Sequence, residues 1–456
     1  MKPQRKTLAA GACVVAALVA APLVAGANDA DRSGEVKAAI DAGKAKNVIL
    51  LIGDGMGDSE ITAARNYAYG AAGRMALDTL PLTGEMTTYS VLETDPTAPD
   101  YTPESASTAT AWSTGSKTAD GRISTTPGTD QDLTTVLDKA EAAGMLTGVV
   151  TTSELTDATP AAPMAHVAAR ACQGPANMGP CPQDAKPAGP GSIAEQSIDH
   201  RVDVLLGGGR SRYDQPITGG PADGQTVRAA AAAAGYQVVT DQPGLAAATP
   251  GRPVLGLFST GNMATRWTGL PATKPASGPQ RCNETNPAAV AEPTLGEMTT
   301  RAIELLSTPA ARGNGRAAGQ AGFFLQVESA SIDKRNHVSQ PCEQIGETVN
   351  FDEAVSAALE FARADGNTLV IVTGDHAHTS QILEPDATPA GFASVLTTDE
   401  GQEMMLSYGT GSTPTSQEHT GSQLRVAAEG PQAANVVGVI DQTDIARIMS
   451  RALGVR

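Results

Sequence analysis

The sequence predicts an α/β fold in which a large, mainly parallel central sheet carries helices on both of its faces. Four short apolar runs each end in carboxylate or imidazole side chains, and they span residues 47–54, 148–159, 323–337 and 368–376. Runs this apolar and this short are typical of strands that are buried on both faces of a parallel sheet. The segments between them alternate helical and strand patterns, which favours right-handed crossovers within one domain.

Residues 1–27 are predicted to be a secretory signal peptide, and residues 28–456 a single domain with loop insertions. The chain begins with basic residues, continues with an apolar stretch at 8–24, and reaches an Ala-Gly-Ala cleavage signal at 25–27. A membrane anchor is the weaker interpretation, because the stretch ends in this signal and contains Pro22. No later stretch is long and apolar enough to span a bilayer. We therefore expect an exported protein, periplasmic or extracellular, with no membrane anchor.

The alternation of helices and strands is clearest in the middle and at the end of the chain. Helical spacing covers 133–140 and 355–362, and each segment is followed by a glycine, a typical helix stop, and then by a strand. The chain closes with a predicted strand at 435–440 and a helix whose apolar face runs from Ile445 to Leu453.

Three looser segments are predicted to be insertions rather than interdomain linkers. They span 173–192, 262–293 and 309–321, and they are rich in Gly, Pro and small polar residues. The last of them is predicted to be a surface loop. None has the length or the charge bias that would separate two domains.

The chain is acidic, with 49 Asp and Glu residues against 32 Lys and Arg residues and a formal net charge of −17. Removal of the first 27 residues, which carry three basic and no acidic side chains, leaves 429 residues and a charge of −20. Nucleic acid and anionic membranes are therefore poor candidate partners. An anionic substrate would need local positive charge at its site, which metal ions could supply.

The cysteines agree with export. Cys13 lies in the signal peptide, and the four that remain, Cys172, Cys181, Cys282 and Cys342, suggest two disulfides. Of the three possible pairings we favour Cys172 with Cys181, because this bond closes a short Gly/Pro-rich loop, and this leaves Cys282 with Cys342. A structural zinc site is the alternative, but no C-x-x-C spacing supports it.

Seven carboxylate and imidazole residues are candidate metal ligands, and most of them follow separate apolar runs: Asp54, Glu328, Asp333, His337, Asp375, His376 and His419. Mixed Asp and His ligands suit zinc, whereas all-oxygen ligands suit magnesium. Each residue alone could be a turn residue, a helix cap or a satisfied polar group. Parallel strands bring their carboxyl ends to one edge of the sheet, so the set together predicts a shared metal cluster.

A nucleophile and an anion-binding side chain are predicted outside this set. The segment 103–112 is rich in small hydroxyl residues and could be a flexible loop, but its alanines and its tryptophan favour order. Ser105 could then begin a helix, where free N–H groups and a nearby metal would favour its alkoxide. Arg170 is placed one turn after His166 on a predicted helix. Lone arginines are usually surface residues, but a guanidinium is also a preferred partner of phosphate.

Together these motifs resemble those of the bacterial alkaline phosphatases, which are secreted, zinc-dependent phosphomonoesterases. The resemblance runs from residue 45 to the C-terminus and rests on long motifs at 52–57 (IGDGMG), 105–117 (SASTATAWSTGSK), 157–160 (DATP), 328–337 (ESASIDKRNH), 373–378 (TGDHAH) and 418–421 (EHTG). It implies an alkaline phosphatase-like fold, a homodimer, and hydrolysis of phosphate monoesters through a covalent phosphoserine. The products would be an alcohol and inorganic phosphate.

The resemblance also implies a role for residues near the nucleophile. Ser105 would become phosphoserine, Arg170 would clamp two phosphate oxygens, and Lys334 would reach phosphate through water. His378 would orient a ligand of the first zinc. The chain departs from the enterobacterial enzymes at Glu104, where those enzymes place Asp before the serine. The extra methylene is expected to shift the contact with Arg170.

Three metal sites are implied at the matching positions, two for Zn²⁺ and one for Mg²⁺. The first zinc would be held by Asp333, His337 and His419. The second would be held by Ser105 together with Asp54, Asp375 and His376. The magnesium would be held by Asp54, Thr159 and Glu328, with Asp157 in its water-mediated shell. Asp157 and Lys334 match the form of the family that holds magnesium, rather than zinc or cobalt, in the third site.

Other functions are weaker interpretations of the same residues. A sulfatase of this superfamily would need a C/S-x-P-x-R context, whereas Ser105 is followed by Ala-Ser-Thr-Ala. Phosphodiesterases of the superfamily typically use Thr as the nucleophile and lack a counterpart of Glu328. A phosphate-binding protein would need an anion site, but neither a nucleophile nor two zinc-type ligand sets.

Overall fold

The computed structural model describes residues 31–308 and 322–455, and those from Ser33 onward form one compact unit. The signal peptide predicted at 1–27 and the loop predicted at 309–321 lie outside the described residues, so the domain boundary after residue 27 stays a prediction. Within the described ranges, no helix is both long enough and apolar enough to cross a membrane.

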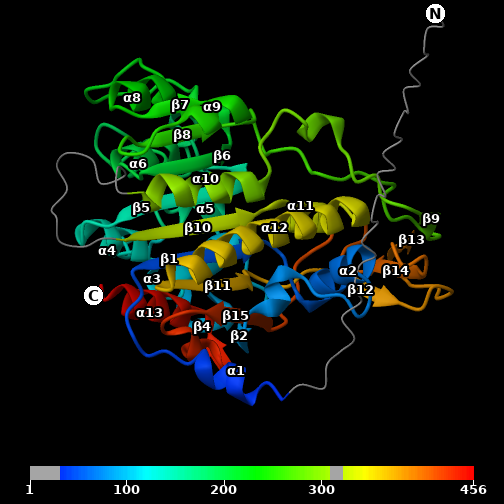
Figure 1. Cartoon of the computed structure of the whole chain (residues 1–456). Helices are drawn as coiled ribbons and strands as arrows, with labels where there is room; N and C mark the ends of the chain where they lie inside the picture. The colour runs from blue at the N-terminus through cyan, green and yellow to red at the C-terminus, as the bar shows by residue number, and fades with distance from the viewer. Residues whose placement is uncertain (1–30, 309–321, 456) are drawn as a thin grey trace, which may run out of the picture. The chain divides into compact units, whose positions relative to one another are not determined.

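A ten-stranded sheet forms the centre of this unit (Figure 1), as the sequence predicts. Among its described strands only β15 runs antiparallel to its neighbours, and every other pair is parallel. In spatial order the strands are β16 (Gly438–Asp441), β2 (Leu82–Thr87), β15 (Leu424–Glu429), β11 (Thr368–Gly374), β1 (Asn47–Gly53), β10 (Phe323–Ser329), β5 (Leu146–Glu154), β6 (Val204–Gly208), β8 (Val254–Leu257) and β7 (Gln237–Val239).

The four apolar runs of the sequence form four adjacent strands, β11, β1, β10 and β5, in the middle of the sheet. Every residue of β1, β10 and β11 is buried, which explains why these runs carry apolar residues on both faces. The register places Gly53 beside both Ser329 and Gly374. The polar residues that follow these three strands therefore emerge at the same edge of the sheet.

Helices cover both faces of the sheet, again as predicted. The side chains of β1 alternate, so that Leu50 packs in one apolar core and Leu51 in the other. The first core is covered by α3 (Ser105–Thr114), α4 (Val136–Ala142), α6 (Ile193–Asp199), α8 (Val227–Ala233) and α13 (Gln442–Leu453). The second is covered by α2 (Asp58–Ala68), α9 (Gln242–Ala247), α10 (Leu295–Ser307) and α12 (Pro341–Asp365). Figure 1 shows α10 and α12 in front of the sheet.

Smaller elements complete the described fold. A second sheet has the strand order β12 (Ser380–Leu383), β14 (Glu403–Tyr408), β13 (Phe392–Thr397) and β9 (Ser277–Gln280), and β3 (Ser90–Leu92) pairs with β4 (Asp95–Asp100). The short helices are α1 (Ser33–Ala38), α5 (Ala158–Ala161), α7 (Arg210–Tyr213) and α11 (Ser331–His337). The 3₁₀ turns are η1 (Ala76–Thr79), η2 (Pro175–Asn177), η3 (Pro287–Ala289) and η5 (Ala433–Val436).

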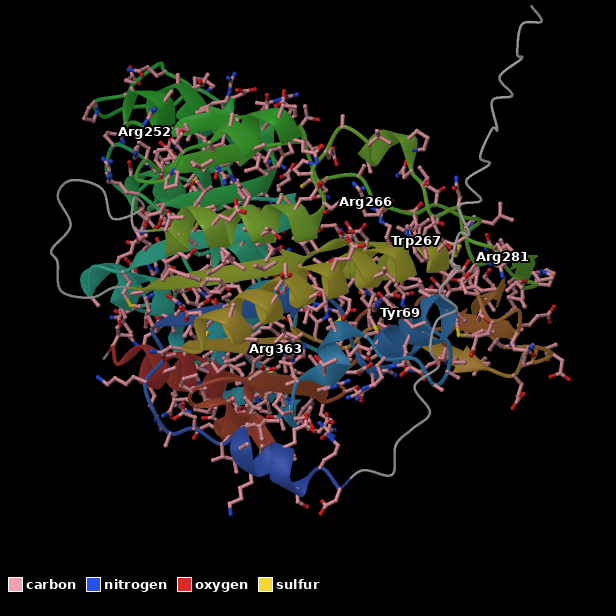
Figure 2. The ribbon with its side chains drawn as sticks, in the orientation of Figure 1. Tyr69, Arg252, Arg266, Trp267, Arg281 and Arg363 are labelled. Atoms are coloured by element: carbon pink, nitrogen blue, oxygen red, sulfur yellow. A yellow bond between two sulfur atoms is a disulfide. The ribbon has the colours of Figure 1, made fainter. Side chains whose placement is uncertain are left out.

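The insertion at 262–293 packs against the rest of the unit and is held there by specific contacts. Trp267 is buried and its ring centroid lies 5.7 Å from that of Tyr67 on α2. The backbone N–H of Arg266 donates to Glu347 Oε1 (2.8 Å), and Arg281 pairs with Asp399 (3.0 Å). Figure 2 labels Arg266, Trp267 and Arg281 along this segment. Specific contacts therefore order a segment whose composition suggested only a loose insertion.

Two predicted elements differ from the observed ones. The helix predicted around His166 and Arg170 is wrong, because Val167 forms an antiparallel bridge with Ile123 and holds this segment extended. The strand predicted at 435–440 begins only at Gly438, since η5 occupies the residues before it. In the first place long-range pairing overrides the local pattern, and in the second a local turn shortens the strand. The helices predicted within 355–362 and from Ile445 to Leu453 lie inside α12 and α13.

The two disulfides join the cysteines as predicted, Cys172 to Cys181 and Cys282 to Cys342. The first bond spans 9 residues of sequence and the second spans 60. A disulfide limits the conformations of the unfolded chain, and the limit grows with the length of the loop that it closes.

We expect the double variant Cys282→Ser/Cys342→Ser to lose more stability than Cys172→Ser/Cys181→Ser. The chain-entropy relation gives losses of about 4 and about 2.5 kcal/mol for loops of these lengths. Thermal melting of both variants at the same metal concentration tests the order. Equal melting temperatures for the wild type and both variants would contradict it.

Candidate metal centre

The predicted site residues converge at the carboxyl ends of the central strands. Asp54 directly follows β1, and Asp375 and His376 directly follow β11. Asp333 and His337 lie on α11, which begins just after β10. Their convergence follows from the parallel direction and the register of three neighbouring strands.

Asp333 is the centre of a first cluster, which it forms with three histidines. Its Oδ1 lies 3.3 Å from His337 Nε2, 3.1 Å from His378 Nε2 and 3.4 Å from His419 Nε2. The Nε2 atoms of His337 and His419 are 3.1 Å apart. These four side chains can each offer one atom to a shared ion, and the mixture of one oxygen with imidazole nitrogens suits zinc.

Backbone carbonyls set the ring orientation of two of these histidines. His419 Nδ1 lies 3.1 Å from the carbonyl oxygen of Pro103, and His337 Nδ1 contacts the carbonyl oxygen of Gln417. An N–H that donates to a carbonyl leaves the other ring nitrogen free to bind a metal, and this arrangement is general among metal-binding histidines. Both rings therefore direct Nε2 into the cluster.

Asp54, Asp375 and His376 form a second cluster, and Ser105 lies beside it. His376 Nε2 is 3.5 Å from Asp54 Oδ1 and 3.1 Å from Asp375 Oδ2. The Ser105 Oγ lies 3.4 Å from the same Nε2. The other oxygen of Asp375 is held by the N–H of Gly55, which donates to Oδ1 at 2.8 Å. All of these side chains are buried.

Several candidate ligand atoms at this edge of the sheet have no hydrogen-bond partner within the described residues. Among them are the oxygens Asp54 Oδ1, Thr159 Oγ1, Asp333 Oδ1 and Asp375 Oδ2. The close approaches of the imidazoles to Asp333 and Asp375 are therefore not aligned as hydrogen bonds. A buried oxygen without a partner is costly. The donor set thus fits cations, which need no hydrogen-bond alignment.

The pKa values of the buried carboxyls point to the same conclusion. Burial raises the pKa of Asp375 to about 6 and that of Glu328 to about 7. Burial, together with the charge of Asp375, raises the pKa of Asp54 well above its usual range. Asp333 differs: burial alone would raise its pKa, but its three histidine neighbours lower it well below the usual range. Nearby positive charge is what would keep the first three carboxyls ionised at neutral pH.

Ser105 is the first residue of α3, as the sequence suggested, and Glu104 is its N-cap. The Glu104 carboxylate accepts from the N–H of Ser107 (3.2 Å) and from the N–H of Gly121 (2.6 Å). Ser105 is only 4% exposed. The N-terminus of this helix therefore presents the serine hydroxyl to the second cluster, and helix N-termini favour anions.

A chain of ion pairs links Glu104 to Lys334 across the site. Arg170 pairs with the Glu104 carboxylate through one nitrogen and with Asp157 Oδ1 through another at 2.7 Å. Asp157 Oδ2 pairs with Lys334 Nζ, also at 2.7 Å. Burial alone would raise the pKa of Asp157, but Lys334 and Arg170 lower it far below its usual range. Asp157 therefore stays ionised and holds the side chains of Arg170 and Lys334 in place.

Thr159 and Glu328, the other predicted magnesium ligands, are also buried at this edge. Glu328 Oε2 accepts from the hydroxyls of Thr151 and Ser153, which belong to β5. The charge of Glu328 contributes to the raised pKa of Asp54, which places the two carboxyls within electrostatic reach. The oxygen donors Asp54, Thr159 and Glu328 suit Mg²⁺ by type.

The sequence patterns did not indicate two buried polar residues that support this site. Gln326 on β10 accepts from Trp112 Nε1 (3.1 Å) and donates to the carbonyl oxygen of Thr159 (2.8 Å). Gln417 is fully buried, and its side chain accepts from the N–H groups of Thr410 and Gly411. A glutamine inside an otherwise apolar strand was the only sequence signal for the first. Gln417 directly precedes the motif at 418–421, but no sequence pattern indicated its structural role.

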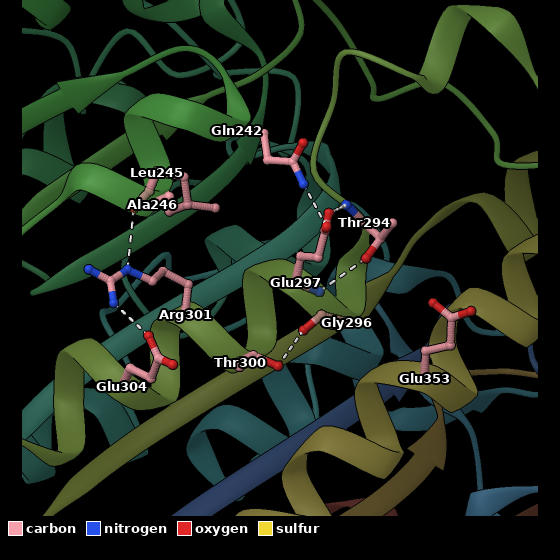
Figure 3. A pocket seen from close by; sticks show the side chains of 10 residues that line it. All are labelled: Gln242, Leu245, Ala246, Thr294, Gly296, Glu297, Thr300, Arg301, Glu304 and Glu353. Atoms are coloured by element: carbon pink, nitrogen blue, oxygen red, sulfur yellow. Dashed lines mark hydrogen bonds and ion pairs between the residues drawn. The ribbon is translucent and has the colours of Figure 1, made fainter. Parts of the chain in front are cut away.

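A hollow elsewhere on the protein contains none of the predicted site residues. It has a volume of about 460 Å³ and lies between α9, α10 and α12 (Figure 3). Its one arginine, Arg301, is engaged by Glu304 Oε2 at 2.5 Å and by the carbonyl oxygen of Leu245 at 3.3 Å. Figure 3 shows these contacts, which leave the hollow without the chemistry of the metal centre.

Comparison with known proteins agrees with this geometry. The alkaline phosphatase family profile matches residues 45–415 and 411–455. Streptomycin-6-phosphate phosphatase of Streptomyces griseus is 50% identical over 456 residues, covering 100% of this chain and 98% of the relative. Alkaline phosphatase of Escherichia coli K12 is 50% identical, covering 93% of this chain and 90% of the relative.

The fold also matches a solved structure. Alkaline phosphatase of Thermus thermophilus superposes with a TM-score of 0.66 at 22% sequence identity. The match covers 93% of this chain and 95% of that one. At this identity the likeness concerns the fold, and it agrees with the large, mostly parallel sheet.

We expect Gln326→Leu to destabilise the protein and to reduce phosphatase activity. The substitution leaves the indole N–H of Trp112 and the carbonyl of Thr159 without their partner, at about 1–3 kcal/mol for each buried group. It also removes a link between α3, which carries Ser105, and α5. Denaturant unfolding and an activity assay measure both effects. The matched control is Gln381→Leu at an exposed strand position, and equal losses in the two variants would contradict the expectation.

Proposed function

Since this chain belongs to the alkaline phosphatase family and is a phosphoric monoester hydrolase, we propose that it acts through a covalent phosphoserine on Ser105, with two Zn²⁺ and one Mg²⁺. The observation that carries the proposal is the position of Ser105 Oγ. It lies at a helix N-terminus, 3.4 Å from His376 Nε2 in the second cluster. A hydroxyl beside a metal-type ligand set is the arrangement that nucleophilic catalysis needs.

The metal ligands are proposed as follows. One Zn²⁺ is held by Asp333, His337 and His419, and the other by Asp54, Asp375 and His376 with Ser105. The Mg²⁺ is held by Asp54, Thr159 and Glu328, with Asp157 bound through water. When bound, these ions supply the positive charge that lowers the pKa of a hydroxyl or water and balances the charge of phosphate and of the leaving oxygen. The buried, unpartnered carboxylate oxygens support this assignment.

Ser105 performs the first chemical step. Its Oγ forms a bond to phosphorus while the bond between phosphorus and the ester oxygen breaks. The alcohol leaves and gains, overall, the proton that the serine hydroxyl loses. A water then attacks the phosphoserine, and the bond from phosphorus to Oγ breaks. One hydrogen of the water returns to Ser105 and the other stays on inorganic phosphate.

Arg170 and Lys334 orient the phosphate during both steps. A guanidinium has five N–H donors in a planar fork, and the pairs with Glu104 and Asp157 leave further donors for two phosphate oxygens. Lys334 contacts phosphate through water, and Asp157 holds both cations in place. Glu104 competes for Arg170, so its length affects how firmly phosphate is held. His378 positions Asp333 as a ligand.

The cellular setting is also proposed. The two disulfides favour an oxidising compartment, which supports export by the N-terminal 27 residues to the periplasm or the medium. We propose that the mature protein is a homodimer without a membrane anchor, and that nucleic acid is not a partner. The substrates are phosphate monoesters, and the product inorganic phosphate binds at the same site.

Ser105→Ala should lower turnover of p-nitrophenyl phosphate by roughly 10³-fold or more, because the nucleophile is lost. Metal content should stay as in the wild type, since the other ligands remain. Steady-state kinetics and elemental analysis check both. The matched control is Ser113→Ala, which removes from the same helix a buried hydroxyl that has no hydrogen-bond partner among the residues the structure describes. Unchanged turnover in Ser105→Ala would remove this residue from the mechanism.

His419→Ala should lose one Zn²⁺ and most of the activity, because the first cluster loses a ligand. Elemental analysis after dialysis measures the loss. Glu418→Ala, which changes the exposed neighbouring residue, serves as the control. Wild-type zinc content in the histidine variant would contradict the assignment.

Removal of metal by EDTA should abolish turnover of p-nitrophenyl phosphate, and Zn²⁺ with Mg²⁺ should restore it. Streptomycin 6-phosphate, the monoester in the name of one relative, extends the same assay to a further substrate. A phosphate-binding protein would give no turnover with or without metal. Preferred turnover of a diester would contradict a phosphomonoesterase.

A further inference from the structure

The six histidines of the chain fall into two separate groups. Four of them lie in the metal centre, and the remaining two, His166 and His200, meet at Asp138 on α4. Their ring centroids are 6.2 Å apart although 34 positions separate them in sequence. We propose that Asp138, Glu141, His166 and His200 form a further zinc site, distinct from the metal centre.

Distances between the donor atoms suit a tetrahedral ion. His166 Nε2 lies 3.7 Å from Asp138 Oδ2, and His200 Nδ1 lies 3.6 Å from Asp138 Oδ1 and 3.7 Å from Glu141 Oε2. These separations are too long for good hydrogen bonds. Zinc bonds of about 2.1 Å in a tetrahedron place neighbouring donors roughly 3.4 Å apart. Asp138, His166 and His200 each offer one donor atom within 4.8 Å of the others, so small side-chain movements would close these three around one ion. Glu141 lies against His200 alone, and a rotation of its side chain would add the fourth donor.

His166 is held in the orientation that metal ligation requires. Its Nδ1 lies 3.0 Å from the carbonyl oxygen of Ser124, so the N–H donates there and the Nε2 lone pair faces Asp138. Ser124 is itself buried and its hydroxyl donates to the carbonyl of Ala162 at 2.6 Å. An imidazole fixed by a backbone carbonyl is the usual support of a metal-binding histidine.

The two carboxylates are supported in the same way. Asp138 Oδ2 accepts from the N–H of Thr135 (2.8 Å), and Glu141 Oε1 accepts from the hydroxyl of Thr147 (3.0 Å). In each carboxylate one oxygen is held by the protein and the other faces His200. The held oxygen of Asp138, Oδ2, is also the one that His166 approaches. Asp138 and Glu141 are three residues apart on α4, a spacing that places both on one face of the helix.

Gln196 on α6 joins the segments that carry the two histidines. Its side chain accepts from the backbone N–H of His166 and donates to the carbonyl of the same residue, both at 2.9 Å. Its own carbonyl accepts from the backbone N–H of His200, also at 2.9 Å. The four proposed ligands thus come from α4, the 163–171 segment and the end of α6, and a shared ion would brace the three together.

Charge and donor type favour zinc over a hard cation. Two carboxylates and two neutral imidazoles carry a charge of about −2, which a divalent ion balances. The side chains are 12–25% exposed, so an ion can reach them from solvent. The site is also separate from the metal centre. Glu141 contacts Thr147 near the start of β5, whereas Glu328 contacts Thr151 nearer its end, and Figure 1 shows α4 and α11 toward opposite ends of the central strands.

Zinc content tests the proposal in the full-length mature protein. After equilibrium dialysis against buffered Zn²⁺, His200→Ala should hold one zinc fewer than the wild type, while its turnover of p-nitrophenyl phosphate stays within about twofold. Glu141→Gln should weaken zinc binding at this site by about tenfold or more. The control is Asp199→Ala, an exposed neighbour of His200 that should keep the wild-type zinc content.

Retained activity separates this result from a failure at the metal centre, where loss of zinc abolishes turnover. Equal zinc content in the wild type, His200→Ala and Glu141→Gln would overturn the proposal. A second measurement needs no variant. Anomalous diffraction at the zinc edge from wild-type crystals should give a peak between His166 and His200. Peaks at the metal centre without one at this position would overturn the proposal as well.

Discussion

Carboxylates buried at one edge of the central sheet are the constraint on which the rest of this structure depends. Asp54, Glu328 and Asp375 are each at most 3% exposed, and burial raises the pKa of all three. An ionised carboxylate in such a place is unfavourable unless positive charge lies close to it. Arg170 and Lys334 provide part of that charge but share it with Glu104 and Asp157. The negative charge that these two side chains leave unbalanced supports the proposal that divalent cations bind here.

Such a cluster needs a rigid framework, which the sheet and its buried amides supply. Parallel strands in register bring Asp54 and Asp375 to neighbouring positions. Gly55 then turns the chain away with φ = +66°, and a Cβ there would lie only 2.9 Å from Asp333 Cα. Gln326 ties α3 to α5 through the sheet. Rigid support of this kind prevents the buried carboxylates from turning toward other hydrogen-bond donors. Their oxygens therefore stay available to bind a cation.

The six histidines of the chain all lie in groups of side chains that could bind a metal ion. Four gather around Asp333 and Asp375, and the rings of His337, His378 and His419 are each oriented by a backbone carbonyl or N–H. The other two meet beside α4 with the same kind of support, from the carbonyl of Ser124 and the carboxylates of Asp138 and Glu141. Similar hydrogen bonding thus supports the histidines of the metal centre and those of the proposed further zinc site, and Ser105 lies beside the metal centre.

The central strands and the start of a helix at Ser105 could be predicted from local sequence patterns. The pairing of Cys172 with Cys181 follows from closure of a short loop, and it leaves Cys282 to pair with Cys342. The resemblance to the family predicted the candidate ligands residue by residue. Tertiary structure decided the extended path before Arg170, where pairing of Val167 with Ile123 overrode a helical pattern. It also decided the support by Gln326 and Gln417 and the meeting of His166 with His200. These contacts join residues far apart in the chain, and no local spacing encodes such distances.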